Sequence, residues 1–256
     1  MIQIEPIKAF TDNYIWLVRT NEGVLVVDPG DSKPVIDFLT KNNLQLDGIL
    51  ITHHHFDHTG GIKELLKKYS ISDVIGPANC HKDINKEVAE GDSIDIIGLN
   101  FKVLEVPGHT LDHIAFYLKK DSESHLFCGD TIFSSGCGRV FEGTFEQMHN
   151  SISKLSQLPD STKIYCAHEY TLSNLAFAKL AEPNNKKILE REIEVKDLQA
   201  RDIPSIPTTI AKEKEFNPFL RCAEKDMIDS LINKYNLTNT DPVNIFSELR
   251  RWKDSL

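Results

Sequence analysis

The chain has 256 residues, with 29 Lys and Arg against 38 Asp and Glu, which gives a formal net charge of −9. This acidic balance excludes general binding to nucleic acid, because phosphate binding needs a basic face. Hydrophobic residues make up 40%, and no apolar run approaches the ~18 residues of a membrane span, so we expect a globular protein without membrane association. The N-terminal segment lacks the basic start and apolar core of a signal peptide, and five scattered cysteines lack a C-x-x-C pair. Both features predict a reducing, cytoplasmic location.

The first two thirds of the chain alternate strand-like runs with helical patterns. Strands are expected at residues 2–6, 13–19, 24–27, 48–51, 93–97, 101–106, 114–118, 125–128 and 163–166, and helices at 34–39, 60–69 and 145–158. Strands interleaved with helices indicate an α/β fold, which we assign to residues 1–170.

After residue 170 the pattern changes to helices. Apolar stripes at helical spacing cover residues 172–180, 188–198, 227–232 and 243–249. Between the second and third stripes, the segment 203–207 contains two prolines and is expected to be an ordered connector. We therefore expect a helical C-terminal domain over residues 171–256.

Four candidate metal ligands fall within six residues, directly after the strand-like run 48–51. They are His53, His55, Asp57 and His58, in the pattern H-x-H-x-D-H. Imidazole nitrogen and carboxylate oxygen are donors that zinc and similar metals prefer. Four donors this close together cannot all serve one tetrahedral ion comfortably, so the cluster indicates a two-metal site.

Three more candidate ligands, His109, Asp130 and His168, each follow another apolar, strand-like run. Strands whose C-terminal ends meet at one edge of a sheet can bring such loop residues together. The alternative is that these are ordinary surface polar residues. One histidine after one strand would favour that alternative, but the matching contexts of all seven donors favour a metal site.

The remaining histidines lack this context. His54 occupies an x position of the cluster and is not expected to bind metal. The others are expected to be surface or core residues: His81, His113, His125 and His149. Asp28 precedes a Pro-Gly pair and is interpreted as a turn-forming residue.

The ligand pattern resembles that of the metallo-β-lactamase superfamily. The resemblance is carried by the H-x-H-x-D-H box, Gly108-His109-Thr110, Gly129-Asp130-Thr131 and His168. Further segments are similar to glyoxalase II, the hydroxyacylglutathione hydrolase family: residues 10–14, 136–139, 168–171, 216–221 and 249–253. The resemblance covers essentially the whole chain and implies an αββα sandwich with a dinuclear site, followed by a helical C-terminal domain.

The resemblance also implies how the ligands are divided. His53, His55 and His109 would hold one metal, and Asp57, His58 and His168 the other, with Asp130 bridging both. It implies two divalent ions per chain, with zinc expected and iron or manganese as alternatives. The catalytic groups would be Asp57 and Asp130 together with a metal-bound hydroxide.

The implied reaction is hydrolysis of S-D-lactoylglutathione to glutathione and D-lactate, the second step of methylglyoxal detoxification, by a monomeric enzyme. The implied glutathione-binding residues are Arg139, Phe141, Tyr170, Arg250 and Lys253. Some family members have Lys in place of Arg139 and Tyr in place of Phe141. Phe141 lacks the hydroxyl through which such a Tyr would form a hydrogen bond with glutathione. The three basic residues would supply the local positive charge that an acidic chain otherwise lacks.

Other interpretations stay open at this point. The same scaffold supports a β-lactamase, a lactonase or a nuclease, and also an iron-dependent persulfide dioxygenase that acts on glutathione. A metal kept only for stability is a non-enzymatic alternative. Without the resemblance, residues 250–253 would be interpreted as a solvated helix face. The helical C-terminal domain, the acidic balance and the complete second ligand set favour the dinuclear thioester hydrolase.

Overall fold

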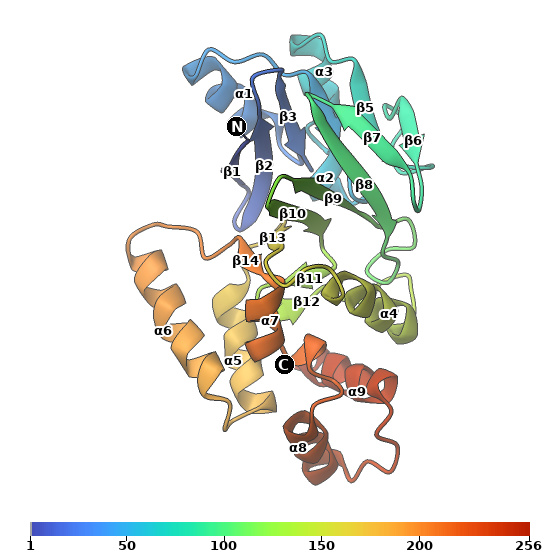
Figure 1. Ribbon diagram of the computed structural model, residues 1–256, viewed down its shortest axis with the longest axis vertical. Coiled ribbons are helices and arrows are strands. Elements are labelled where there is room, and N and C mark those ends of the chain that lie inside the picture. The colour runs from blue at the N-terminus through green and yellow to red at the C-terminus, as the bar shows by residue number, and fades with distance from the viewer. Residues whose placement is uncertain (1) are drawn as a thin grey trace. The chain divides into compact units, whose positions relative to one another are not determined.

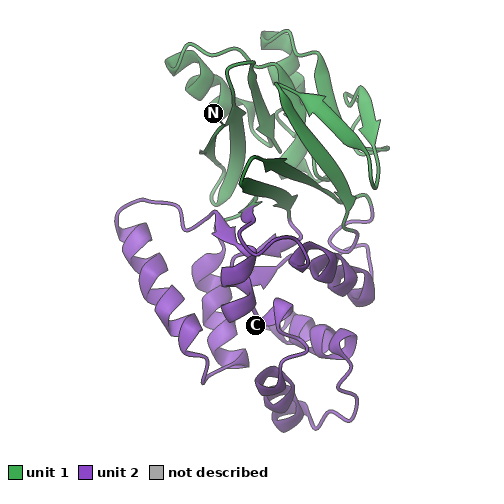
Figure 2. Cartoon of the chain, viewed as in Figure 1, with its two compact units in different colours: residues 1–106, 112–129, 165–168 green, residues 107–111, 130–164, 169–256 purple. Residues whose placement is uncertain are grey.

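The computed structural model describes residues 2–256, which form two compact units (Figure 2). Unit 1 comprises the described residues up to 106 together with 112–129 and 165–168. Unit 2 comprises residues 107–111, 130–164 and 169–256.

Unit 1 contains two sheets (Figure 1). The first has the order β1-β2-β3-β4-β5-β6 and is formed by β1 (Gln3–Ala9), β2 (Asn13–Arg19), β3 (Val24–Val27), β4 (Gly48–Leu50), β5 (Asp73–Pro77) and β6 (Lys86–Val88). β1, β2 and β3 pair antiparallel, whereas β3 to β6 run parallel. The helices are α1 (Ser32–Lys41), α2 (Phe56–Thr59) and α3 (Ile62–Lys68). They follow β3 and β4, as parallel strands require a crossover between them.

The second sheet of unit 1 has the order β13-β10-β9-β8-β7. Its strands are β7 (Ser93–Ile96), β8 (Leu99–Glu105), β9 (Ile114–Lys120), β10 (Glu123–Gly129) and β13 (Lys163–Cys166), of which only the last two residues belong to unit 1. β7 to β10 form an antiparallel meander.

The alternation of side chains along β2 explains how the sheets stack. Ile15 and Leu17 belong to a buried cluster with Val35 and Leu65 of the helices. Trp16 points to the opposite face, since successive strand residues alternate. Its indole N–H donates to the carbonyl of Cys166 at 2.9 Å, and its ring lies 4.9 Å from that of Tyr165. Each face of the first sheet is therefore buried, one by helices and the other by the second sheet.

Unit 2 is mostly helical. Its helices are α4 (Phe145–Ser156), α5 (Thr171–Ala181), α6 (Lys186–Ala200), α7 (Ile210–Phe216), the 3-10 helix η1 (Pro218–Leu220), α8 (Lys225–Tyr235) and α9 (Pro242–Asp254). A short hairpin joins β11 (Ile132–Phe133) to β12 (Gly136–Cys137), and β14 (Thr208–Thr209) pairs with residues 163 and 164.

Two apolar groups hold the helices of unit 2 together. Residues of α5, α6 and α7 form one cluster: Leu175, Ala178, Ile188, Val195 and Phe216. Phe219 of η1 lies between the other helices, 6.0 Å from the ring of Phe177 in α5 and 5.5 Å from that of Phe246 in α9. Burial of such aromatic rings contributes about 2–3 kcal/mol each.

The structure confirms the expected strands and helices, with boundaries shifted by a few residues. The local sequence pattern did not predict β5, β6, α2, α7 and the short strands β11, β12 and β14. α7 lacks a continuous apolar stripe because Lys and Glu fill most of its positions, so no helix was expected there. Across residues 2–256, no helix combines the length and apolar character that crossing a membrane would require.

Candidate active site

Unit 1 brings five of the seven predicted ligands together. His53 and His55 follow β4, Asp57 and His58 lie in α2, and His168 follows β13. Oδ2 of Asp57 lies 3.5 Å from Nε2 of His58 and 3.4 Å from Nε2 of His168. Nε2 of His53 lies 3.1 Å from Nδ1 of His55. Nitrogen and carboxylate donors thus converge in two groups, as a metal site requires.

Asp28 was interpreted only as a turn residue, and the structure gives it a larger role. It has a φ of 54°, in keeping with a turn. Its side chain is also buried, and it accepts hydrogen bonds from the backbone N–H and the hydroxyl of Thr52, both at 2.8 Å. Its Oδ2 lies 3.0 Å from Nδ1 of His58. Since an ionised carboxylate only accepts, His58 carries its proton on Nδ1 and presents Nε2 as the ligand atom.

The same carboxylate acts on His53 through Thr52. The Thr52 hydroxyl donates a hydrogen bond to Asp28. It therefore acts as the acceptor toward Nδ1 of His53, which lies 3.1 Å away and donates its N–H. Nε2 of His53 is then the nitrogen whose lone pair can bind a metal. The position of Asp28 gave a usable signal: it directly follows β3, which runs parallel to β4, so both strand ends reach the same edge.

Two neighbouring residues, Asp12 and Asn13, orient the other donors of unit 1. Oδ1 of Asp12 lies 2.7 Å from Nδ1 of His168, which directs Nε2 of that ring toward Asp57. The Asn13 amide donates to Oδ2 of Asp57 at 3.0 Å. Both residues lie in the 10–14 motif, but no local pattern assigned them these roles.

A glycine allows the turn after β3 to approach α2. A Cβ added at Gly30 would lie 1.8 Å from the backbone oxygen of Asp57. Any side chain at this position would push the turn away from α2. The turn carries Asp28, so Gly30 helps to keep that carboxylate within reach of His58.

His109 and Asp130, the other two predicted ligands, both belong to unit 2. Nε2 of His109 lies 3.4 Å from Oδ2 of Asp130. Nδ1 of His109 lies 2.8 Å from the carbonyl oxygen of Arg139, which can only accept, so this histidine also presents Nε2. Four predicted histidine ligands therefore have a partner that fixes which nitrogen carries the lone pair, and the donor set fits divalent metal ions.

Two histidines that were not expected to bind metal lie beside the cluster. The ring of His113 is buried and stacks on that of His53, with centroids 4.5 Å apart and planes inclined by 15°. Nδ1 of His54 lies 3.0 Å from Oδ1 of Asp112, directed at a carboxylate outside the predicted ligand set. His113 therefore supports a ligand ring by packing.

The predicted glutathione-binding cations gather at the C-terminal end of α9, inside unit 2. Arg139 is exposed, and its Nε lies 3.4 Å from Oδ1 of Asp254. Arg250 is only 2% exposed; it donates to the carbonyl of Cys137 at 3.1 Å and to Asp254 at 2.8 Å. Asp254 thus joins the two arginines, and Arg250 meets the β11–β12 hairpin rather than solvent.

Lys253 is the third cation of this group. Its ammonium donates to Oδ1 of Asn174 in α5 and lies 5.8 Å from the ring centroids of both Phe177 and Phe219. Burial, together with the nearby Arg250 cation, lowers the pKa of Lys253 to about 8. This lysine therefore changes its charge close to neutral pH, which an exposed lysine does not.

The two predicted aromatic contacts differ in exposure. Phe141 is 62% exposed, and its ring centroid lies 5.2 Å from that of His109. Tyr170 is half-buried at the start of α5 and packs edge-on against Phe133 at 5.3 Å. An exposed aromatic ring beside a predicted metal ligand offers an apolar surface to a bound molecule.

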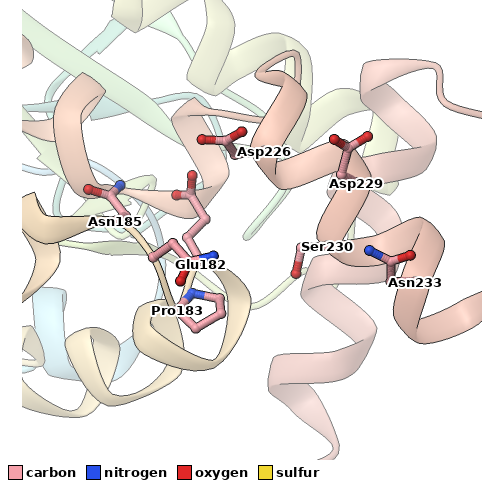
Figure 3. Close-up of a pocket in the computed structure, with 8 residues that line it drawn as sticks. Glu182, Pro183, Asn185, Asp226, Asp229, Ser230 and Asn233 are labelled. Carbon is pink, nitrogen blue, oxygen red and sulfur yellow. The ribbon is translucent and has the colours of Figure 1, made fainter.

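A pocket of about 450 Å³ also lies in unit 2, between the α5–α6 connection and α8 (Figure 3). It is lined by Glu182, Pro183, Asn184, Asn185, Asp226, Asp229, Ser230 and Asn233. Glu182 accepts two hydrogen bonds from Arg221 Nε, at 3.0 and 2.9 Å. None of the predicted glutathione-binding residues is among these lining residues, so the pocket is separate from the predicted substrate contacts.

Comparison with known families accounts for both the ligand pattern and the C-terminal helices. The family described as the metallo-beta-lactamase superfamily matches residues 10–168. A solved structure, the BLEG-1 B3 metallo-beta-lactamase, superposes with a TM-score of 0.64 and 22% identity over 86% of this chain and 99% of that chain. The chain therefore belongs to the metallo-β-lactamase superfamily.

More specific relatives narrow this assignment. The family described as hydroxyacylglutathione hydrolase C-terminus matches residues 169–256. Hydroxyacylglutathione hydrolase of Shewanella halifaxensis is 49% identical and covers 100% of both chains. That of Vibrio parahaemolyticus is 46% identical, with 99% of each chain covered. Within the superfamily, the chain belongs to the hydroxyacylglutathione hydrolase family.

Proposed function

We propose that this chain hydrolyses glutathione thioesters, with S-D-lactoylglutathione as the expected substrate and glutathione and D-lactate as products. The proposal is carried by the oriented histidine and carboxylate donors in a chain that also gathers cations at the end of α9. Full-length relatives named hydroxyacylglutathione hydrolase support the same reaction.

For the metal centre, we propose the ligand division that the family resemblance implies. His53, His55 and His109 would hold one divalent ion, and Asp57, His58 and His168 the other, with Asp130 shared. Two features support this division: Asp57, His58 and His168 converge in unit 1, and His109 lies beside Asp130 in unit 2. Asp130 directly follows the last residue of β10 in the chain. Zinc is the expected metal, and iron or manganese would suit the same donors.

When bound, two divalent ions lower the pKa of water toward 7 and polarise a carbonyl oxygen, which suits them to thioester hydrolysis. Asn13 holds the Asp57 carboxylate in place, and Asp28 and Asp12 hold the imidazoles. The leaving group is a thiol with a pKa of about 8.5, so it departs as a thiolate without a general acid. We therefore assign no proton donor to the leaving group.

For substrate binding, we propose the cations at the end of α9 together with the exposed aromatic ring. Glutathione carries two carboxylates and one ammonium, a net anion that needs local positive charge on an acidic protein. Arg139 and Lys253 would contact the carboxylates, and Phe141 and Tyr170 the glutathione chain. The buried Arg250 would act mainly through the positive potential that it adds to this group, together with its hold on Cys137 and Asp254.

The proposal is tested by hydrolysis of S-D-lactoylglutathione by purified protein, with metal content measured before and after chelation. We expect turnover that disappears on chelation and returns with added metal, at about two ions per chain. Hydrolysis that persists without metal would refute the metal mechanism. Oxygen uptake with glutathione persulfide, in place of thioester hydrolysis, would favour the dioxygenase alternative.

Three further features stay as proposals. We place a domain boundary near residue 170, which the family matches over residues 10–168 and 169–256 support. A monomer and a cytoplasmic location are expected from the sequence. Sedimentation of the purified protein and fractionation of cells test these two expectations.

A further inference from the structure

The side-chain amide of Asn174 connects the β11–β12 hairpin to the last turn of α9. Asn174 lies in α5 and is 2% exposed. Its Nδ2 donates to the carbonyl of Ser134 at 3.0 Å, and its Oδ1 accepts from the ammonium of Lys253. One buried side chain therefore contacts both the loop that leads to Arg139 and the cation Lys253 (Figure 1 shows α5, β12 and α9).

The surroundings leave this amide only one orientation. A carbonyl can only accept, so the NH2 group must face Ser134, and the oxygen must then face Lys253. The amide also lies very close to the hairpin: a Cβ added at Gly136 would lie 2.5 Å from both Cγ and Nδ2 of Asn174. The absence of a side chain at Gly136 is what allows the amide to lie directly on the hairpin backbone.

The hairpin on the other side of this amide is itself firmly held. The Asn217 amide donates to the carbonyls of Phe133 and Gly136 at 3.1 and 2.9 Å, and the backbone N–H of Ser135 donates to Glu213 at 2.8 Å. The side chain of Asn174 therefore forms its hydrogen bond with a hairpin whose backbone is held in place by other buried side chains. A lysine side chain has four rotatable bonds and would otherwise sample many positions. Because Oδ1 of Asn174 fixes the ammonium of Lys253 beforehand, less conformational entropy is lost when that ammonium binds an anion.

We propose that Asn174 is a positioning residue for substrate binding, holding the Lys253 ammonium where it receives a carboxylate of the glutathione moiety. This inference rests on the proposed function and adds a residue that neither the ligand pattern nor the substrate-binding motif contains. Asn174 makes no contact with the reacting thioester in this scheme. It acts through Lys253 alone.

The test compares three variants with the wild-type protein. N174L removes both the donor and the acceptor and keeps the branched shape of the side chain. N174D keeps an acceptor for Lys253 but places a carboxylate against the carbonyl of Ser134. N233L is the matched control, since Asn233 is an exposed helical asparagine in α8 of the same unit.

Two readouts separate positioning from general structure. The first is the pKa of Lys253, followed by NMR after reductive methylation with ¹³C-formaldehyde, with K253R identifying the signal. The second is steady-state kinetics on S-D-lactoylglutathione and on S-lactoylcysteamine, a thioester without the glutathione carboxylates. Circular dichroism confirms that each variant is folded.

We expect N174L to lower the pKa of Lys253 and to raise KM for S-D-lactoylglutathione about tenfold, which corresponds to one hydrogen bond to a charged group. Its kcat, and its kinetics on S-lactoylcysteamine, should stay close to wild type. N174D should raise the pKa of Lys253, because a negative charge favours the ammonium. N233L should change neither readout.

The inference is wrong if the pKa of Lys253 is the same in all folded variants, or if N174L slows both thioesters equally. If N174L fails to fold, the pKa of Lys253 in N174D decides. If the wild-type protein does not hydrolyse S-D-lactoylglutathione, the proposed function fails, whereas the link from Asn174 to Lys253 is still judged by the pKa readout.

Discussion

Nδ1 of His58 lies 3.0 Å from Oδ2 of Asp28, and both side chains are buried. The same carboxylate accepts a hydrogen bond from the hydroxyl of Thr52, and that hydroxyl accepts a hydrogen bond from Nδ1 of His53. One aspartate at the end of β3 therefore determines which ring nitrogen carries the lone pair in two predicted ligands. Such partners raise the basicity of the ligand and prevent its ring from rotating.

Replacing Asp28 with Asn should weaken metal binding by about 10- to 100-fold, the usual effect of losing a partner of a ligating histidine. An amide nitrogen in place of Oδ2 would face the Nδ1–H of His58 and repel it. Competition with a chelator measures the affinity. D37N on the exposed face of α1 is the control, and equal affinities in the two variants would contradict the role given to Asp28.

Removing the metal should lower thermal stability as well as activity. The donors converge in the folded protein, so an ion binds the folded state and stabilises it by about 4 kcal/mol at a thousand times its dissociation constant. For a chain of this size, that corresponds to a fall of roughly 8–16 °C in Tm on chelation. Scanning calorimetry with and without chelator gives the answer. A Tm unaffected by chelation would mean that the donors do not hold a metal.

The pKa of Lys253 gives the proposed substrate affinity a pH dependence. Burial lowers this pKa to about 8, so the ammonium is present below pH 8 and is lost as the pH rises through that value. We expect kcat/KM for S-D-lactoylglutathione to fall above about pH 8, since this ratio reports groups of the free enzyme. K253R keeps its charge and should lose less kcat/KM over the same range. Parallel profiles for wild type and K253R would exclude Lys253 as the titrating group.

The buried carboxyl of Glu213 should make the free energy of unfolding depend on pH. It is fully buried in α7, and burial raises the pKa of its carboxyl above the ordinary value of 4.5. The folded chain then holds a proton that the unfolded chain releases, so the stability from the protonated group is complete below pH 4.5 and declines as the pH rises. E213Q is neutral at every pH, so its Tm relative to wild type should be higher at pH 8 than at pH 5. E215Q, on the exposed face of α7, should show no such change when both are followed by calorimetry.

A substitution at Phe141 is expected to strengthen glutathione binding. Its ring is exposed beside His109, so a hydroxyl added to it enters solvent-accessible space without displacing packed atoms. F141Y should lower KM for S-D-lactoylglutathione by about 2- to 10-fold through one added hydrogen bond. An unchanged KM would show that position 141 gives glutathione only an apolar surface. F56Y, at an exposed ring in α2, is the control.

Local pattern was enough to predict most of the strands, the helices α5, α6, α8 and α9, and the ligand box after β4. The period of apolar residues follows from backbone geometry, and the identity of a metal ligand follows from its donor chemistry. Both can be recognised from residues that are close together in the sequence. The resemblance to glyoxalase II rested on short motifs, and the full-length relatives confirm the family.

Other features depended on which distant segments meet. Asp28 looked like a turn residue until the parallel pairing of β3 and β4 placed it beside Thr52 and His58. Arg250 looked exposed, but the packing of α9 buries it against the hairpin. Asn174 showed no pattern at all, because its partners lie 40 and 79 residues away in the chain. Hydrogen bonds over such separations, and the burial that lowers the pKa of Lys253, depend on tertiary packing that local sequence does not encode.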